Sequence, residues 1–235
     1  MHNNSELAVV IPIFNEEKNI ISLIHDWQVL FTEKKITPVF IIINDGSTDK
    51  SLSLLTELRN RIPFFTILSH HNQGHGPSLL KGYQEANTYN WIFQIDSDHE
   101  YETAAFIDLW NHRDQYDLLL GERNEKNASI VRSFISFVSR LTVKVFYGKR
   151  IRDVNSPYRL MRGSILKSVI EKIPRKSFAP NILITGFFVL KQMRIYTVPI
   201  KKRKNKFSKK SKMNFYFTKG CLLSIFQTIR FRFKL

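Results

Sequence analysis

The chain has 235 residues, 43% of them hydrophobic, which is enough for one large α/β domain or for a domain with an appendage. Its net charge of +16 is uneven, because 17 of the 36 Lys and Arg residues follow Glu171, the last acidic residue. The single cysteine, Cys221, excludes an intramolecular disulfide framework and favours a reducing compartment. We therefore expect a near-neutral catalytic or binding domain followed by a basic segment that contacts an anionic partner.

Short apolar runs alternate with amphipathic segments of helix length through the first half of the chain. In chain order, the pattern predicts a strand at 7–13, a helix at 16–33, a strand at 38–43, a turn at 45–49 leading into a helix, a strand at 64–68, a Gly-rich turn at 72–78 leading into a helix through about 88, a strand at 91–95, a helix at 102–112 and a strand at 116–121. Continuous apolar strands separated by helices indicate an α/β fold, with a mostly parallel sheet and helices on both faces.

Polar residues follow four of these strands at the point where each strand ends. They are Asn15-Glu16, Asn44-Asp45, Asp96-Ser97-Asp98 and Glu122-Arg123. Ligands bind such sheets outside the carboxyl ends of the strands, so we expect these groups to line one ligand site.

The pair Asp96 and Asp98 is the most informative of these groups. Two carboxylates one residue apart, directly after a buried strand, can share a hard divalent cation such as Mg²⁺ or Mn²⁺. A cation held there beside a diphosphate would offset the charge that develops on a leaving nucleoside diphosphate. The alternative is a solvated Asp-x-Asp turn that caps the next helix. The position at the end of a buried strand favours the metal site.

The C-terminal part predicts contact with a charged surface. Residues 201–212 are strongly basic, and residues 213–235 mix aromatic and aliphatic side chains with Lys219, Arg230, Arg232 and Lys234. This composition predicts an interfacial membrane helix, and the alternative is a helix packed on the domain with a solvated basic face. No stretch reaches the ~18 apolar residues of a membrane span, and the start of the chain lacks the pattern of a signal peptide.

Four segments, taken in order, resemble the family 2 glycosyltransferases with a GT-A fold. They are VVIPIFNEEKNI (9–20), IINDGSTDKS (42–51), NQGHGPSLLKGYQEA (72–86) and QIDSDHEY (94–101). Two more segments, RIRDVNSPYRLMRG (150–163) and IYTVPIKKRKNKFSKKSKM (195–213), resemble the dolichyl- or polyprenyl-phosphate sugar transferase subgroup. The resemblance implies a GT-A domain over residues 1–200, with a basic loop and an amphipathic segment over residues 201–235.

The resemblance also implies roles for individual residues. The nucleotide pocket would be lined by Pro12, Phe14, Glu16 and Asp45, the metal would be held by Asp96, Asp98 and Glu100, and phosphate would be contacted by Arg123 and Arg132. The acceptor site would lie over Asp153, Ser156 and Arg159, and a basic loop with Lys206, Ser211 and Lys212 would close on the donor or on the lipid phosphate. Arg159, Lys206 and Lys212 are thereby further candidates for donor binding, and the candidate catalytic residues are Asp98, Asp153 and Arg132.

Several positions depart from the pattern of the subgroup. Asn44 replaces the first Asp of an Asp-Asp pair, Pro157 stands where Gly is usual, and His75 stands where Lys is frequent. The basic loop is out of register, with Lys206 in place of the usual Arg. These departures concern the acceptor more than the fold or the metal site.

The predicted function is transfer of a sugar, dependent on Mg²⁺ or Mn²⁺, from a UDP- or GDP-linked donor to a polyprenyl phosphate of the dolichyl or undecaprenyl type. We expect the protein to be cytoplasmic and bound peripherally to an anionic membrane surface. A phosphate acceptor is already an anion at neutral pH and needs no strong general base. One alternative is an enzyme of the same fold that acts on a saccharide hydroxyl of a cell-surface glycan and needs a base, for which Asp153 is the candidate. Another is a nucleic-acid-binding protein using KKRKNK, but the near-neutral body does not extend that footprint, so we expect no nucleic-acid partner.

Overall fold

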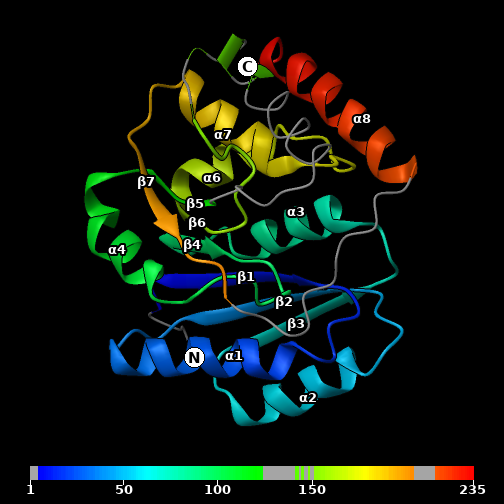
Figure 1. The fold of residues 1–235 in the computed structure, drawn as a ribbon, viewed down its shortest axis with the longest axis vertical. Helices are drawn as coiled ribbons and strands as arrows, with labels where there is room; N and C mark the ends of the chain where they lie inside the picture. The colour runs from blue at the N-terminus through cyan, green and yellow to red at the C-terminus, as the bar shows by residue number, and fades with distance from the viewer. Residues whose placement is uncertain (1–4, 124–140, 143, 146–147, 149–150, 204–214) are drawn as a thin grey trace.

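The computed structural model describes residues 5–123, 141–142, 144–145, 148, 151–203 and 215–235, with the side chains of 215–219 and 221 excepted. The described residues form one sheet between two layers of helices, with a further helix outside one layer (Figure 1). Its strands are β1 (Leu7–Ile13), β2 (Val39–Asp45), β3 (Phe65–His70), β4 (Trp91–Gln94), β5 (Leu118–Arg123), β6 (Arg159–Arg162) and β7 (Ile195–Ile200), in the order β3-β2-β1-β4-β6-β5-β7.

The sheet is mostly parallel. β6 runs antiparallel to both of its neighbours, β4 and β5, and the remaining strand pairs are parallel. The loops after β1, β2 and β4 therefore leave the sheet at the same edge. The α/β class and the mostly parallel sheet expected from the sequence are confirmed.

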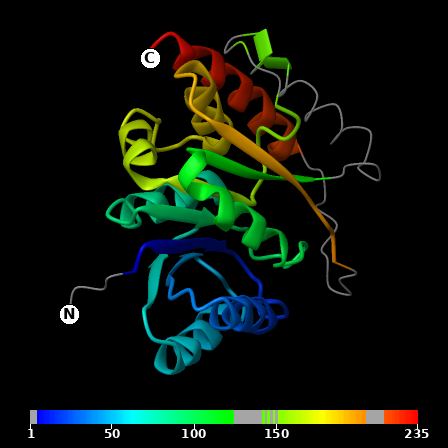
Figure 2. The ribbon, with the colours of Figure 1, turned by 90° about the vertical axis from the view of Figure 1, so that its left-hand side faces the viewer.

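The helices cover both faces of this sheet (Figures 1 and 2). One face carries α1 (Ile20–Glu33), α2 (Ser51–Arg61) and α4 (Ala105–His112), and the short 3₁₀ helix η1 (Arg113–Gln115) follows α4. The other face carries α3 (His75–Glu85), α6 (Gly163–Ile170) and α7 (Pro180–Leu190), and α8 (Phe215–Arg232) packs on α7.

Strand β1 shows why the sheet is buried on both faces. All seven of its residues are buried. Val10 packs in the core under α3, whereas Val9 and Ile11 pack in the core under α1. Side chains alternate across a strand, so an unbroken apolar run supplies both cores at once. An aromatic cluster closes the α1 side, where the rings of Trp27 and Phe93 lie 5.1 Å apart at 60°.

Some boundaries differ from the sequence prediction. Helix α1 begins at Ile20 instead of residue 16, because the chain first makes a turn in which the carbonyl of Glu16 accepts hydrogen bonds from the amides of Asn19 and Ile20. The V-P-I segment forms β7 as the resemblance implied. Strand β6 was not predicted, and it places one antiparallel strand in the middle of the sheet.

The segment after β7 returns to the loop after β4. The amide of Glu102 donates to the carbonyl of Lys201, and the amide of Arg203 donates to the carbonyl of Glu100. The first residues of the predicted basic loop are therefore bonded to the chain that follows the Asp-x-Asp pair. The proposed division at residue 200 stays a prediction. Among the helices of the described residues, none combines the length and the apolar character that a membrane crossing requires.

Candidate active site

A cleft of about 310 Å³ opens at the carboxyl ends of β1, β2 and β4. It is lined, among others, by six residues that the sequence singled out: Pro12, Phe14, Glu16, Asp45, Asp96 and Asp98. Its volume falls in the range of sites that hold small organic ligands. Of the polar residues expected at the strand ends, Glu16, Asp45 and the Asp96–Asp98 segment line this cleft. Asn15, Asn44, Glu122 and Arg123 are not among its lining residues.

The loops after β1 and β2 are held together by hydrogen bonds. The amide of Asn15 donates to Ser47 Oγ over 3.0 Å, and the amide of Thr48 donates to Asn15 Oδ1 over 2.7 Å. The amide of Glu16 donates to Ser51 Oγ over 2.8 Å. Asn15 has a φ of 56°, a left-handed conformation that Asn tolerates better than most residues. These bonds fix Phe14 and Glu16 at the rim of the cleft.

Asp45 is fixed by the turn that begins α3. Its Oδ1 and Oδ2 accept hydrogen bonds from the amides of Gln73 and Gly74, over 2.7 and 2.9 Å. Gly46 lies so close to this turn, with a φ of 69°, that an added Cβ would overlap the amide nitrogen of Asn72. Asp45 is therefore a buried, oriented carboxylate at one wall of the cleft.

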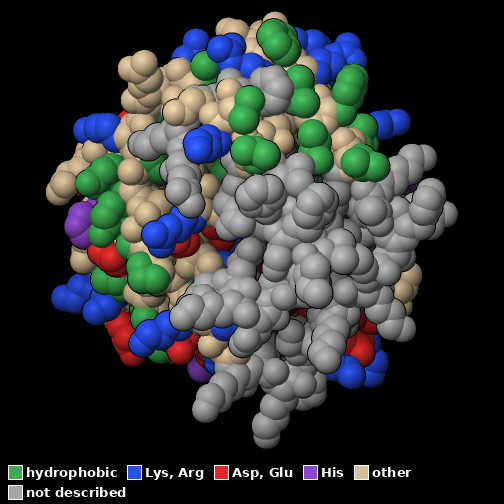
Figure 3. All heavy atoms as spheres, turned by 45° about the horizontal axis from the view of Figure 1, so that its top comes forward, with side chains coloured by type: hydrophobic (Ala, Val, Ile, Leu, Met, Phe, Trp, Pro, Cys, Tyr) green, Lys and Arg blue, Asp and Glu red, His purple; other side chains and the backbone are tan. Residues whose placement is uncertain are grey.

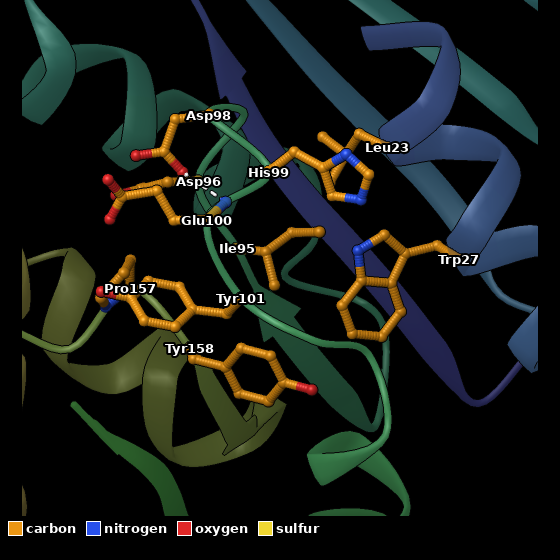
Figure 4. Close-up of a pocket in the computed structure, with 10 residues that line it drawn as sticks. All are labelled: Leu23, Trp27, Ile95, Asp96, Asp98, His99, Glu100, Tyr101, Pro157 and Tyr158. Atoms are coloured by element: carbon orange, nitrogen blue, oxygen red, sulfur yellow. Dashed lines mark hydrogen bonds between the residues drawn. The ribbon is translucent and has the colours of Figure 1, made fainter. Parts of the chain in front are cut away.

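Asp96 and Asp98 lie on the opposite wall, directly after β4. Asp96 Oδ1 accepts a hydrogen bond from Gln94 Nε2 over 3.0 Å, and His75 Nε2 lies 3.8 Å from the same oxygen. Asp98 Oδ1 accepts from the amide of Glu100 over 3.2 Å. Figure 4 shows the carboxylates of Asp96, Asp98 and Glu100 gathered at one side of this loop.

The electrostatics of this wall favour a cation. Burial, together with the neighbouring carboxylates of Asp96, Glu100 and Glu16, raises the pKa of Asp98 to about 7, against the opposing hydrogen bond from the Glu100 amide. Within the described residues, no three His, Cys, Asp or Glu side chains are placed to hold a metal ion by themselves. Mg²⁺, however, is commonly held by one or two carboxylates together with substrate phosphates. The donor set of Asp96 and Asp98 fits such an ion.

Glu100, the third candidate ligand, is engaged elsewhere in this structure. Its Oε1 lies 3.0 Å from Lys202 Nζ, in the segment that follows β7. Arg203, the next residue, pairs with Asp26 on α1. Glu100 would have to leave Lys202, or share it, in order to coordinate a metal.

A small cavity of about 20 Å³ lies behind the Asp-x-Asp loop (Figure 4). It is bordered by the rings of Trp27, Tyr101 and Tyr158 and by His99, which has a φ of 54°. This volume is close to that of one water molecule. The loop that carries the carboxylates therefore rests on a close-packed aromatic base.

Asp153 and Arg123 form a two-point ion pair. Arg123 Nε and Nη2 donate to Asp153 Oδ2 and Oδ1 over 2.6 and 2.8 Å. Burial opposes the charge of Arg123, but the hydrogen bonds that Arg123 donates to Asp153 outweigh it and raise the pKa of the guanidinium above its ordinary value. The candidate base and one candidate phosphate ligand are therefore bound to each other.

Arg159 lies in the protein interior, where its side chain is fully buried. Its guanidinium donates to the carbonyls of Ser156, Asn181 and Val154, over 2.8, 3.2 and 3.3 Å. Burial lowers its pKa to about 10. Arg159 thus lies beneath the 153–156 loop, which includes the buried Ser156, and ties that loop to α7. Arg132, Lys206, Ser211 and Lys212 lie outside the described residues.

Sequence reasoning missed a buried polar chain behind Asp96. Asn181 Nδ2 donates to Gln94 Oε1 over 3.0 Å, and Tyr83 Oη donates to Asn181 Oδ1 over 2.8 Å. A Gln inside an apolar strand was the only available signal. His75 and Ser78, on the first turn of α3, also line the cleft.

The fold and this cleft define an α/β protein with a ligand site at the carboxyl edge of a mostly parallel sheet. Comparison with known sequences identifies its family. The sequence model of Glycosyl transferase family 2 matches residues 8–170. The chain therefore belongs to glycosyl transferase family 2 and is a glycosyltransferase, as its motifs indicated.

Curated relatives narrow the similarity further. The chain is 26% identical over 194 residues to the undecaprenyl-phosphate 4-deoxy-4-formamido-L-arabinose transferase of Pectobacterium atrosepticum, covering 80% of this chain and 58% of that protein. It is 27% identical over 177 residues to an uncharacterised protein of Methanocaldococcus jannaschii, covering 69% of this chain and 74% of the relative. The chain thus spans little more than half the length of the named transferase.

Solved structures share the fold. The glucosyl-3-phosphoglycerate synthase of Mycobacterium tuberculosis, in complex with Mn²⁺, UDP-glucose and phosphoglyceric acid, superposes with a TM-score of 0.66 at 16% identity, covering 97% of this chain and 80% of that one. S. aureus TarS in complex with UDP-GlcNAc gives a TM-score of 0.59 at 18% identity, covering 88% of this chain and 62% of that one. Both support the GT-A fold expected from the sequence.

Proposed function

We propose that the protein transfers a sugar from a UDP- or GDP-linked donor to a polyprenyl phosphate at a membrane surface, with Mg²⁺ or Mn²⁺ as cofactor. The observation that carries the proposal is the cleft shared by the oriented Asp45 and the Asp96–Asp98 pair, which follow β2 and β4 on either side of β1. Such a cleft offers a hydrogen-bonding wall for a nucleoside and an anionic wall for a metal-bound diphosphate.

The donor would lie along the carboxyl edge of the sheet. Pro12 and Phe14 would contact the base, and Asp45 would accept a hydrogen bond from the base or the ribose. His75, 3.8 Å from Asp96, is placed to donate to a diphosphate oxygen. Asp45 keeps its orientation because the turn at Gln73 and Gly74 binds it from behind.

A bound divalent ion would stabilise the negative charge of the departing diphosphate. Asp96 and Asp98 would hold that ion, and Glu100 is a third ligand only if its pair with Lys202 opens. Arg132, Lys206 and Lys212 remain candidates for contact with phosphate.

Two observations support a lipid phosphate as the acceptor: the name of a related transferase, and the pairing of Asp153 with Arg123. The named transferase from P. atrosepticum carries undecaprenyl phosphate in its name. A phosphate acceptor needs no strong general base, whereas a sugar hydroxyl does. The candidate base, Asp153, is bound at two points by Arg123, an arrangement that suits an acceptor which is already anionic. Arg123 itself would reach phosphate only after leaving Asp153.

The experiment is a transfer assay with radiolabelled UDP- and GDP-sugars and undecaprenyl phosphate in detergent, with and without Mn²⁺. We expect a lipid product whose sugar is released by mild acid, because a sugar–phosphate linkage is labile and an ordinary glycoside is not. Asp98→Asn is the matched inactive control. A product stable to mild acid would favour the saccharide acceptor. Failure of every nucleoside diphosphate to bind, with or without Mn²⁺, would contradict the donor assignment.

A further inference from the structure

Helix α8 presents two different faces. Gly220, Ser224, Thr228 and Phe231 are buried and recur every three or four residues, so they form one stripe that packs on the protein. The opposite stripe and the turn after it expose large apolar side chains, which we call the apolar patch: Leu222 (67% exposed), Leu223 (45%), Phe226 (59%) and Phe233 (79%). A solvated face of a helix would carry polar residues at these positions.

Basic side chains border this patch. Arg230 and Lys234 are exposed on or just beyond the same helix. Arg175 and Lys176 are exposed in the loop before α7, and this loop is bound to α8 because Gln227 Nε2 donates to the carbonyl of Lys176 over 3.3 Å. Figure 3 shows apolar and basic side chains together at this end of the molecule. No acidic residue follows Glu171, so neither α8 nor this loop carries a negative side chain.

The patch lies one loop away from the cleft. An added Cβ at Gly220, in the first part of α8, would overlap the ring of Phe178. An added Cβ at Gly76, in the first turn of α3, would overlap the carbonyl oxygens of Ser177 and Phe178. His75 and Ser78, in the same turn as Gly76, line the cleft. The 177–178 loop therefore contacts α8 on one side and a wall of the cleft on the other.

We propose that this face docks on an anionic lipid bilayer, with the apolar patch of α8 in the interface and the basic border at the headgroups. Large apolar side chains with flanking cations are the composition that binds such an interface. A second copy of the chain is disfavoured because its patch would bring the same positive charge. Nucleic acid is disfavoured because phosphates gain nothing from the exposed leucines and phenylalanines. The biological use of the contact rests on the proposed function, since docking here would bring the cleft close to a lipid-linked acceptor.

The test is co-flotation of the full chain with phosphatidylcholine vesicles, with and without phosphatidylglycerol. We expect binding to the anionic vesicles, and a loss of about tenfold or more in Leu222→Ser/Phe226→Ser. The matched control is Ile21→Ser/Val29→Ser, which removes two exposed apolar residues from α1 on the opposite side of the sheet and should float like the wild type. Arg230→Glu/Lys234→Glu should lose binding to anionic vesicles only.

Two further measurements keep the outcomes distinct. Light scattering reports the mass, and a dimer that becomes a monomer in Leu222→Ser/Phe226→Ser would overturn the proposal in favour of self-association. Wild-type flotation of that variant, absence of wild-type flotation, or an equal loss in the α1 control would also overturn it. Binding of UDP and GDP with Mn²⁺, measured without lipid, should be unchanged in every patch variant. Failure of nucleotide binding with intact flotation would refute the proposed function and leave the docking surface standing.

Discussion

Gln94 and Asp96 are joined by a hydrogen bond at the end of β4, where the Gln94 amide Nε2 donates to Asp96 Oδ1 over 3.0 Å. Gln94 is itself held by Asn181, and Asn181 by Tyr83. All three supporting residues are buried. This series of hydrogen bonds fixes the orientation of Asp96 from inside the protein. The second carboxylate oxygen of Asp96 is left for the cleft.

Replacing Gln94 should therefore weaken metal binding more than nucleotide binding. In Gln94→Met, we expect the Mn²⁺ concentration for half-maximal activity to rise by about tenfold, as for other residues that orient metal ligands. Tyr83→Phe removes only the last hydrogen bond of this series, the one to Asn181, and should raise that Mn²⁺ concentration by less. Nucleotide affinity without metal should stay unchanged. An unchanged Mn²⁺ dependence in Gln94→Met would show that the bond is structural only.

The sequence alone predicted most of the fold, but it did not predict the buried hydrogen bonds that support Asp96. Strand β1 and helix α1 follow directly from apolar periodicity, and the carboxyl-edge rule brought Asp45 and Asp96 to one cleft. Strand β6 was missed because four residues after Pro157 give too short a pattern. The Gln94–Asn181 pair joins residues 87 positions apart, and no local pattern contains such a contact.

The stability of the metal-free protein should fall as pH rises, because of Asp98. Its native pKa of about 7, raised by burial and then by Asp96, Glu100 and Glu16, exceeds the ordinary aspartate value of 3.8. Between these two values the native state binds more protons than the unfolded state, so the free energy of unfolding decreases with increasing pH. Asp98→Asn cannot titrate, so it should remove this decrease.

The measurement is thermal unfolding in EDTA across that pH window. Relative to the wild type, Asp98→Asn should gain on the order of 2 kcal/mol, or roughly 4–8 °C, on going from the acidic to the alkaline end. Asp114→Asn, at an exposed site, is the control and should follow the wild type. Parallel curves for the wild type and Asp98→Asn would contradict the pKa assignment.

Lys202 competes with a metal for Glu100 if that carboxylate is a ligand. Their atoms lie 3.0 Å apart in a partly exposed pair, which is worth at most about 1 kcal/mol. Lys202→Met should then lower the half-saturating Mn²⁺ concentration by about two- to fivefold, and Glu100→Gln should raise it. Lys201→Met, at the exposed neighbouring position, is the control. An unaltered Mn²⁺ affinity in both Glu100→Gln and Lys202→Met would remove Glu100 from the ligand set.

Arg159 should contribute to the stability of the fold. Its replacement by Leu leaves the buried carbonyl of Ser156 without this donor, and an unsatisfied buried group costs about 1–3 kcal/mol. The bonds to the carbonyls of Asn181 and Val154 are lost as well, although Val154 keeps its bond from Thr185 Oγ1. We expect a total loss of about 3–5 kcal/mol and a melting temperature lower by roughly 10 °C or more. A stable Arg159→Leu protein with impaired donor binding would instead support direct contact between Arg159 and the donor.

The pair of Asp153 and Arg123 separates the two acceptor classes. If Asp153 serves only to hold Arg123, then Asp153→Asn leaves a mostly buried guanidinium poorly compensated and destabilises the protein by up to about 3 kcal/mol. The double variant Asp153→Leu/Arg123→Met removes both charges and should recover much of that stability. A double-mutant cycle in thermal unfolding measures this coupling. A general base would behave differently. Asp153→Asn would then retain its melting temperature, and its transfer rate would lose the decline at low pH that protonation of the base causes. That second result would favour a hydroxyl acceptor over a lipid phosphate.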